Sequence, residues 1–122
     1  MIENYAPLTP DLLDDYDIFW TVDTYDYDWA DSEYVALADW VLAGGGLMLE
    51  GDYYRSVYVY NAVLSLLGAG IEYNSSNGYS GYTTDIHEHE ITAGVDSIYL
   101  DYPESHLSVV TSPAAVLVTD RY

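Results

Sequence analysis

The sequence contains no cysteine and no lysine, and Arg55 and Arg121 are its only fixed cations. Without cysteine, the chain cannot form a disulfide, a thiolate metal site or a cysteine nucleophile. Nucleic-acid binding needs clustered Lys and Arg to neutralise phosphates, so we predict no nucleic-acid partner. The same shortage argues against attraction to anionic lipid. No apolar run reaches the roughly 18 residues that a membrane span requires, so we predict no membrane insertion.

Acidic residues and tyrosines are abundant instead. The 122 residues include 21 Asp and Glu, which gives a formal net charge of −19, and 15 Tyr. Half of the residues are apolar, so the charge does not make this a disordered acidic tail. We expect a single domain over residues 1–122, with residues 1–15 as a lead-in segment.

The first two thirds of the chain alternate between strand and helix patterns. Aromatic and β-branched residues predict a buried strand at Tyr16–Val22, and a helix capped by Ser32 ends at the three glycines that begin with Gly44. A short strand, Leu47–Glu50, a helix at about Ser56–Leu67 and a strand at Ala69–Tyr73 follow, in the alternation typical of an α/β fold with a parallel sheet. The apolar spacing of the second helix predicts a buried stripe of Val59, Ala62, Val63, Leu66 and Leu67.

The rest of the chain is predicted to hold a long loop and short strands. Residues 74–90 are rich in Asn, Ser, Gly and Tyr and predict a long loop, which compact domains seldom keep without a role. Three short strands are predicted beyond it, at Ser97–Leu100, Leu107–Val110 and Ala115–Thr119.

Four phrases occur in an informative order: LDDYDIFW, DWVLAGGGLMLEGD, NAVLSLLGAGI and HEITAGVDSIYL. In that order they resemble the class I glutamine amidotransferase-like superfamily, above all its non-catalytic branches, such as the ThuA-like proteins and the similar domains of gliding and intraflagellar-transport proteins. The resemblance covers roughly residues 8–120. It implies a three-layer, flavodoxin-like fold with a mostly parallel central sheet.

The chain departs from this superfamily in two respects. It begins too late to contain the family's first strand and helix, so we expect either a fragment or another segment covering the exposed sheet edge. Active members carry a cysteine at the turn that here reads Glu50-Gly51-Asp52-Tyr53. Amidotransferase chemistry is therefore excluded, and we expect a protein that is not an enzyme.

An acidic loop follows the first predicted strand. Asp23, Asp26, Asp28 and Asp31 lie where ligands bind in open α/β sheets, and their oxygens suit Ca²⁺. The spacing does not match an EF-hand, because position six of the pattern, counted from Asp26, is Asp31 and not glycine. A solvated acidic loop is the alternative interpretation.

Histidine and aspartate supply a second candidate metal site. His87 and His89 would share one face of an extended segment, and a third ligand such as Asp85 or Asp52 would complete a Zn²⁺ site. Asp52 could also act as a general base at the turn after the second strand. The alternatives are a plain loop or a partner contact for the histidines, and a turn-capping role for Asp52.

Tyrosines in loops and at element ends are candidate binding residues, because the side chain is rigid, amphipathic and adaptable in hydrogen bonding. They could stack on sugar rings or pack between subunits, or they could be neutral surface filler. With Asp52, the candidate set comprises Tyr25, Tyr27, Tyr53, Tyr54, Tyr79 and Tyr82.

Together these features predict a non-catalytic binding or assembly module, extracellular or at the cell surface, which associates with itself or another protein or binds carbohydrate. One alternative is a metal-assisted hydrolase acting on carbohydrate or a related substrate through Asp52, His87 and His89. Another is a protein from the cytoplasm of a halophile, whose acidic surface is an adaptation to salt.

Overall fold

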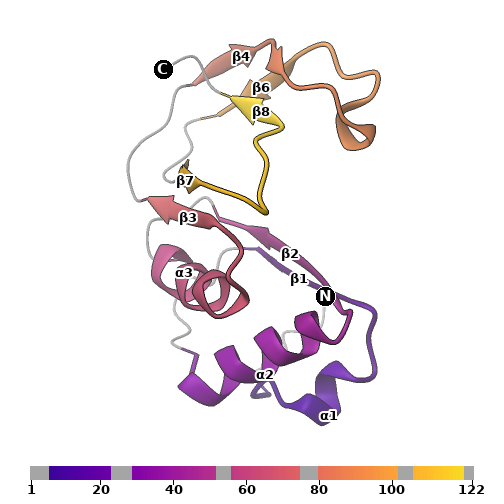
Figure 1. The fold of residues 1–122 in the computed structure, drawn as a ribbon, viewed down its shortest axis with the longest axis vertical. Helices are drawn as coiled ribbons and strands as arrows, with labels where there is room; N and C mark the ends of the chain where they lie inside the picture. Colours follow the sequence, from indigo (N-terminus) through magenta and orange to yellow (C-terminus); the bar gives the residue numbers. More distant parts are fainter. Residues whose placement is uncertain (1–5, 23–28, 52–55, 75–79, 102–105, 120–122) are drawn as a thin grey trace.

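The computed structural model describes residues 6–22, 29–51, 56–74, 80–101 and 106–119. Helices and strands both occur, which confirms a mixed α/β fold. The first part of the chain (Figure 1) contains α1 (Pro10–Leu13), β1 (Ile18–Val22), α2 (Asp31–Leu42), β2 (Gly46–Glu50), α3 (Ser56–Leu67) and β3 (Ile71–Asn74). The remainder contains β4 (Gly81–Thr83), β5 (Asp85–Ile86), the 3₁₀ helix η1 (Glu90–Thr92), β6 (Ile98–Leu100), β7 (His106–Val110) and β8 (Val118–Thr119).

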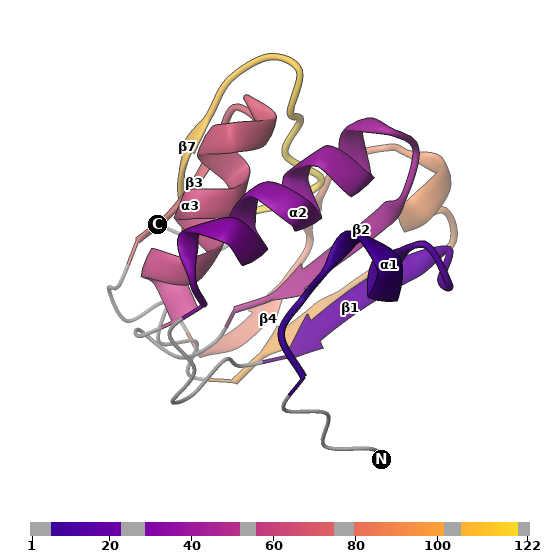
Figure 2. The same cartoon turned by 90° about the horizontal axis from the view of Figure 1, so that it is seen from below.

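A two-stranded parallel sheet with helices on one face forms the N-terminal part. β1 pairs with β2 in a register that runs from Ile18 opposite Gly46 to Val22 opposite Glu50. Figure 2 shows α2 and α3 side by side over these strands. The strands contribute Phe19, Leu47 and Leu49 to the helix-covered face, where they pack against a buried core of Leu13, Trp29, Ala36, Leu37, Val59, Tyr60 and Val63.

Local capping explains where the first two helices begin. The Thr9 hydroxyl accepts a hydrogen bond from the Leu12 amide and caps α1. Ser32 does not cap α2 as predicted, because the helix already begins at Asp31 and its N-cap is Ala30. The carboxylate of Glu33 supplies the other half of a capping box, since it accepts the amide of the N-cap residue Ala30 at 2.8 Å. Its other oxygen accepts the Leu8 amide at 2.8 Å, which ties the lead-in segment to α2.

The glycines after α2 have two different roles. Gly44 has a φ of 117°, in the left-handed region that L side chains avoid, and it ends the helix. A Cβ on Gly45 would overlap the indole ring of Trp40, so the missing side chain lets this ring pack over the turn. The chain then enters β2 directly, and the Gly46 amide bonds to the Asp17 carbonyl at 2.9 Å.

The third strand has an unexpected neighbour. β3 pairs with β7 in antiparallel fashion, and β4–β6 and β5–β8 are antiparallel pairs as well. Within the described residues only β1–β2 is parallel, so the predicted mostly parallel central sheet is not seen there. One physical reason lies at Tyr73, whose backbone amide and carbonyl both bond to the Asn61 side chain of α3, so these groups are occupied by a helix side chain.

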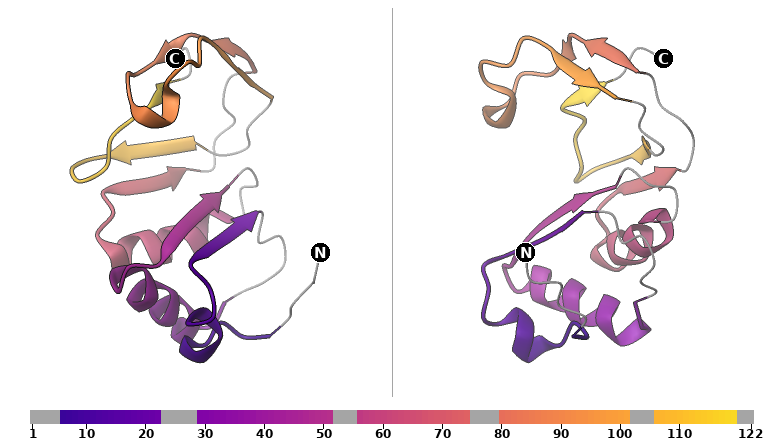
Figure 3. Two further views of the ribbon diagram at one scale, coloured as in Figure 1. Left: turned by 90° about the vertical axis from the view of Figure 1, so that its right-hand side faces the viewer. Right: turned by 180° about the vertical axis from the view of Figure 1, so that it is seen from behind.

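The C-terminal part is built from short strand pairs. The predicted loop over residues 74–90 is wrong in part, because β4 and β5 lie within it and pair with the remote strands β6 and β8. Figure 3 shows this part beyond the β3–β7 pair, on the side away from the helices. Between residues 80 and 101 the buried side chains are Thr83 and Thr92. No helix in the described ranges has the length and apolar character needed to cross a membrane.

Candidate functional site

The face of the β1–β2 sheet opposite the helices carries large apolar side chains in contact with solvent. Ile18 is 68% exposed, Trp20 61% and Met48 51%. Strand alternation places all three on this side, and the register sets Trp20 directly opposite Met48. We call these three residues the outer face. Single exposed apolar residues are ordinary, but neighbours gathered on one sheet face are typical of an interaction surface.

Acidic residues border the outer face. Glu50 follows Met48 on the same side of β2, and Asp17 immediately precedes Ile18; both are exposed. The described part of the chain contains 14 acidic residues and neither of the two arginines, which lie at the undescribed positions 55 and 121. In that part of the chain, the apolar surface is therefore accompanied by negative fixed charge alone.

The sequence does not reveal this surface, because the composition of Tyr16–Val22 predicts a buried strand. That interpretation is wrong for Ile18 and Trp20, and Tyr16 is 60% exposed as well. The segment is apolar on both sides of the strand, so its pattern cannot distinguish a strand covered on two faces from one covered on a single face.

An exposed aromatic pair lies on the C-terminal strands. Tyr82 of β4 is directly opposite Tyr99 of β6, and their ring centroids are 5.0 Å apart in an edge-on arrangement. Tyr82 is 64% exposed and Tyr99 54%. The structure thus places the candidate Tyr82 on the surface and adds Tyr99, which the sequence did not single out.

The predicted histidine ligands lie around β5 and η1. His87 Nε2 is 3.9 Å from an oxygen of Asp85. His89 caps η1, and its Nδ1 accepts the Ile91 amide at 3.1 Å, so this nitrogen already has a structural function. The described residues contain no group of three His, Asp or Glu side chains that could hold a metal ion. The geometry therefore brings together one His–Asp pair of the predicted zinc set.

Most other candidate residues lie outside the described residues. This applies to the calcium candidates Asp23, Asp26 and Asp28, to Asp52, and to the tyrosines at positions 25, 27, 53, 54 and 79. Asp31 is described, and it occupies the first turn of α2, where a carboxylate interacts favourably with the helix dipole. The calcium site and the tyrosine-rich loops stay predictions.

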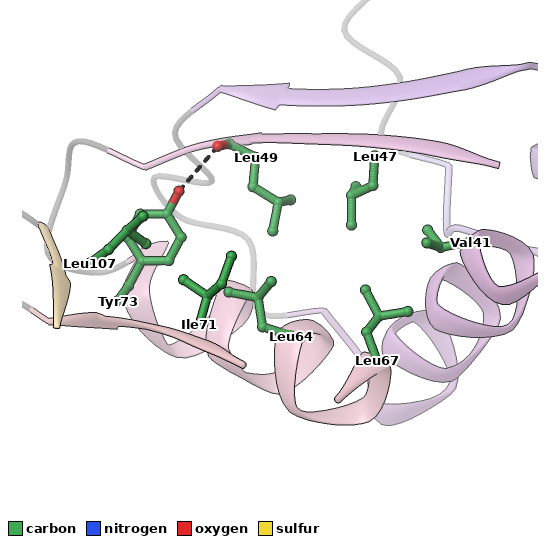
Figure 4. Close-up of a pocket in the computed structure, with 8 residues that line it drawn as sticks. All are labelled: Val41, Leu47, Leu49, Leu64, Leu67, Ile71, Tyr73 and Leu107. Carbon is green, nitrogen blue, oxygen red and sulfur yellow. Dashed lines mark hydrogen bonds between the residues drawn. The ribbon is translucent and has the colours of Figure 1, made fainter. Parts of the chain in front are cut away.

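A cavity of about 360 Å³ lies between β2 and β3 (Figure 4). As far as the described residues show, its lining comes from α2, β2, α3, β3 and β7, with aliphatic side chains and one tyrosine: Val41, Leu47, Leu49, Leu64, Leu67, Ile71, Leu107 and Tyr73. Figure 4 shows these side chains arranged around a common space, with the Tyr73 hydroxyl directed toward β2.

Hydrogen bonds hold one end of the cavity in place. The Tyr73 hydroxyl donates to the Leu49 carbonyl at 3.1 Å, and the Tyr60 hydroxyl donates to the Glu50 carbonyl at 3.2 Å. Gly51 lies between the two rings, since a Cβ there would be 3.0 Å from a ring carbon of each tyrosine. Burial raises the pKa of Tyr73 above its usual value of 10.0 and the Glu50 carboxylate adds to the increase, while a backbone hydrogen bond at Gly51 opposes it.

Comparison with protein-family models, with curated proteins and with solved structures finds no significant match to this chain. The resemblance to the amidotransferase-like superfamily therefore rests on the sequence phrases and their order alone, and it stays a prediction.

Proposed function

We propose that this protein is a non-catalytic binding module that docks a partner protein on the outer face of its β1–β2 sheet. The observation that carries this proposal is the exposure of Ile18, Trp20 and Met48 on one side of two paired strands. Tryptophan and methionine are enriched in protein interfaces, and tryptophan in their energetic centres. Burying these side chains under a partner would remove apolar area from water, and each Å² buried contributes a favourable free energy of about 25 cal/mol.

Charge determines which kind of partner fits. A second copy of the chain would bring another net charge of −19 against an outer face bordered by Asp17 and Glu50. The preferred partner therefore has an apolar centre and a rim of Lys and Arg, because such a rim complements the acidic border and accelerates association. Self-association through the same face is favoured only where salt screens the repulsion.

The finer fold assignment belongs to the same proposal. In a three-layer, flavodoxin-like domain both faces of the central sheet are covered, and a partner on the outer face would supply the third layer. The order β1–α2–β2–α3–β3 is compatible with that architecture. A crystal structure with a bound partner would test the assignment.

A defined peptide pair tests the docking surface. One peptide has a Leu/Phe/Trp centre flanked by Lys and Arg, and the matched peptide carries Glu at the flanking positions. Calorimetry should detect binding of the basic-flanked peptide only, and Trp20→Ala should weaken it by about tenfold or more, as expected for a central interface residue. Tyr58→Ala is the control, since Tyr58 is 80% exposed on α3.

Two outcomes contradict the proposal. Equal binding by the wild-type chain and Trp20→Ala would exclude the outer face. A dimer in light scattering at low salt that Trp20→Ala abolishes would identify a second copy as the occupant in place of a basic partner.

Carbohydrate binding is a second candidate, favoured by the exposed Tyr82–Tyr99 pair. Tyrosine rings at 64% and 54% exposure offer apolar surface on which a sugar ring can stack. Saturation-transfer NMR with a panel of neutral oligosaccharides tests this function. A signal that Tyr82→Ala removes and Tyr58→Ala retains would support it, and no signal from any oligosaccharide would contradict it.

A further inference from the structure

We propose that the cavity between β2 and β3 is a binding site for the hydrocarbon part of a small molecule that carries no negative charge. Protein interiors are normally packed as densely as organic crystals, with few voids larger than a water molecule. The pocket between β2 and β3 departs from that rule, because about 360 Å³ beside its aliphatic side chains stays unfilled and partly open to solvent. This volume lies within the roughly 300–1,000 Å³ typical of small-molecule sites.

The hydrogen bonds around Tyr73 explain why the space is not closed by strand pairing. β2 and β3 are not paired as neighbouring strands of a sheet, and Asn61 bonds to both the amide and the carbonyl of Tyr73 at 2.8 and 2.9 Å. The Tyr73 hydroxyl bridges the remaining gap to Leu49 at 3.1 Å. For β3 to move against β2 at this point, these bonds would have to break. The cavity is therefore a consequence of the native contacts.

The lining specifies the chemistry of the ligand. Seven of the eight lining residues in the described ranges are aliphatic, and the phenol of Tyr73 already donates its proton to a backbone carbonyl. A ligand consequently gains mainly from burying its own apolar surface. Among the described residues no charged side chain lines the cavity, so the ionic part of an amphiphile would have to remain outside.

The surroundings of the cavity decide the sign of that ionic part. Glu50 and Glu72 are exposed neighbours of the lining residues Leu49, Ile71 and Tyr73 along the strands, and the whole chain carries −19. An anionic head group would meet this negative potential, whereas an uncharged or cationic one would not. Leu107 is 48% exposed and places the entrance beside β7.

Three probes with an unbranched chain of eight carbons test the site: 1-octanol, octyltrimethylammonium and octanoate. NMR titration of the intact chain should show saturable shifts for lining residues with the first two probes. Octanoate should bind more weakly by about tenfold, because its carboxylate is repelled. The difference should shrink at 1 M NaCl, where the Debye length is only about 3 Å.

Filling the cavity provides the decisive variants. Leu67→Phe places a larger side chain in the lining, and Leu107→Phe does so at the exposed rim, where the fold tolerates it more easily. Each should weaken octanol binding by about tenfold, the scale associated with a lost methylene-sized contact. Leu66→Phe is the matched control, since Leu66 lies on the same helix as Leu67, is 51% exposed and is not among the residues that line the cavity.

The test also separates this site from the outer face. Trp20→Ala should leave octanol binding unchanged, and the cavity variants should leave binding of the basic-flanked peptide unchanged. Octanol affinity that is equal in Leu107→Phe, Leu66→Phe and the wild-type chain would overturn the proposal, as would the absence of saturation with every probe. Equal affinity for octanoate and octanol would overturn its charge selectivity.

Discussion

Asn61 is expected to stabilise the fold through the two hydrogen bonds that join α3 to β3. Its side-chain nitrogen donates to the Tyr73 carbonyl at 2.9 Å, and its oxygen accepts the Tyr73 amide at 2.8 Å. Both bonds are partly buried. Asn61→Ala removes the two bonds at once and leaves both backbone groups of Tyr73 without this partner.

The expected loss follows from three contributions. Two partly buried hydrogen bonds contribute about 1 kcal/mol each, which gives about 2 kcal/mol. Alanine is the better helix former in the middle of α3, and this returns about 0.5 kcal/mol. The free energy of unfolding should therefore fall by about 1.5 kcal/mol in Asn61→Ala. Asn61→Asp has no such helix gain and keeps one bond, but its second oxygen faces the Tyr73 carbonyl, so it should lose at least as much.

Urea unfolding followed by circular dichroism measures these differences. Ser65→Ala is the matched control, because Ser65 is exposed on the same helix, and its stability should change by less than about 0.5 kcal/mol. If Asn61→Ala and Asn61→Asp both unfold within about 0.5 kcal/mol of the wild-type chain, the argument that Asn61 holds β3 is refuted.

Four further changes have expected outcomes. Glu33→Ala removes the acceptor of the Leu8 and Ala30 amides from a residue that is 6% exposed, and urea unfolding should show a loss of about 3 kcal/mol. Gly45→Ala forces a methyl group into the Trp40 ring, so its urea midpoint should fall by the equivalent of about 1–3 kcal/mol. Because folding raises the pKa of Tyr73, the contribution of its neutral phenol to the stability of the fold is complete below pH 10.0 and is lost as the pH rises further. Between about pH 8 and 12 the free energy of unfolding should accordingly fall less steeply with pH for Tyr73→Phe than for the wild-type chain. With a net charge of −19, the melting temperature should rise between about 0.01 and 1 M NaCl, and a salt-independent value would contradict the importance of self-repulsion.

Elements that depend on local sequence could be predicted. The helix Ser56–Leu67 was predicted with the bounds that the structure shows, because apolar periodicity and the following glycine specify it. Its buried side was predicted less well. Leu66 is 51% exposed, whereas Tyr60 and Leu64 are buried, since α3 packs against both α2 and the β3 side. Periodicity alone does not reveal which neighbours a helix will have.

Long-range pairing and the candidate sites could not be predicted in the same way. β3 joins β7, and β5 joins β8, across segments whose separation leaves no local pattern. The Asn61–Tyr73 contact joins a helix and a strand, and the only signal available was a polar residue among apolar ones in α3. The cavity depends on that contact, so it could not be predicted from the sequence either. The outer face could not be predicted, because an apolar strand indicates burial on both sides whether or not a second layer covers it.

Thr83 and Thr92, the buried threonines between residues 80 and 101, have a consequence for the dynamics of the C-terminal part. Thr83 donates to the Thr119 carbonyl at 2.6 Å and Thr92 to the His87 carbonyl at 2.6 Å, so hydroxyl groups occupy positions where a core would place aliphatic side chains. Hydroxyl bonds to single carbonyls give far less cooperativity than interlocked apolar packing. Backbone amides in β4, β5, β6 and β8 should consequently exchange with deuterium through a local opening that leaves α2 and α3 protected. The chain would then contain two units of different opening free energy, with the Tyr82–Tyr99 surface in the less stable one.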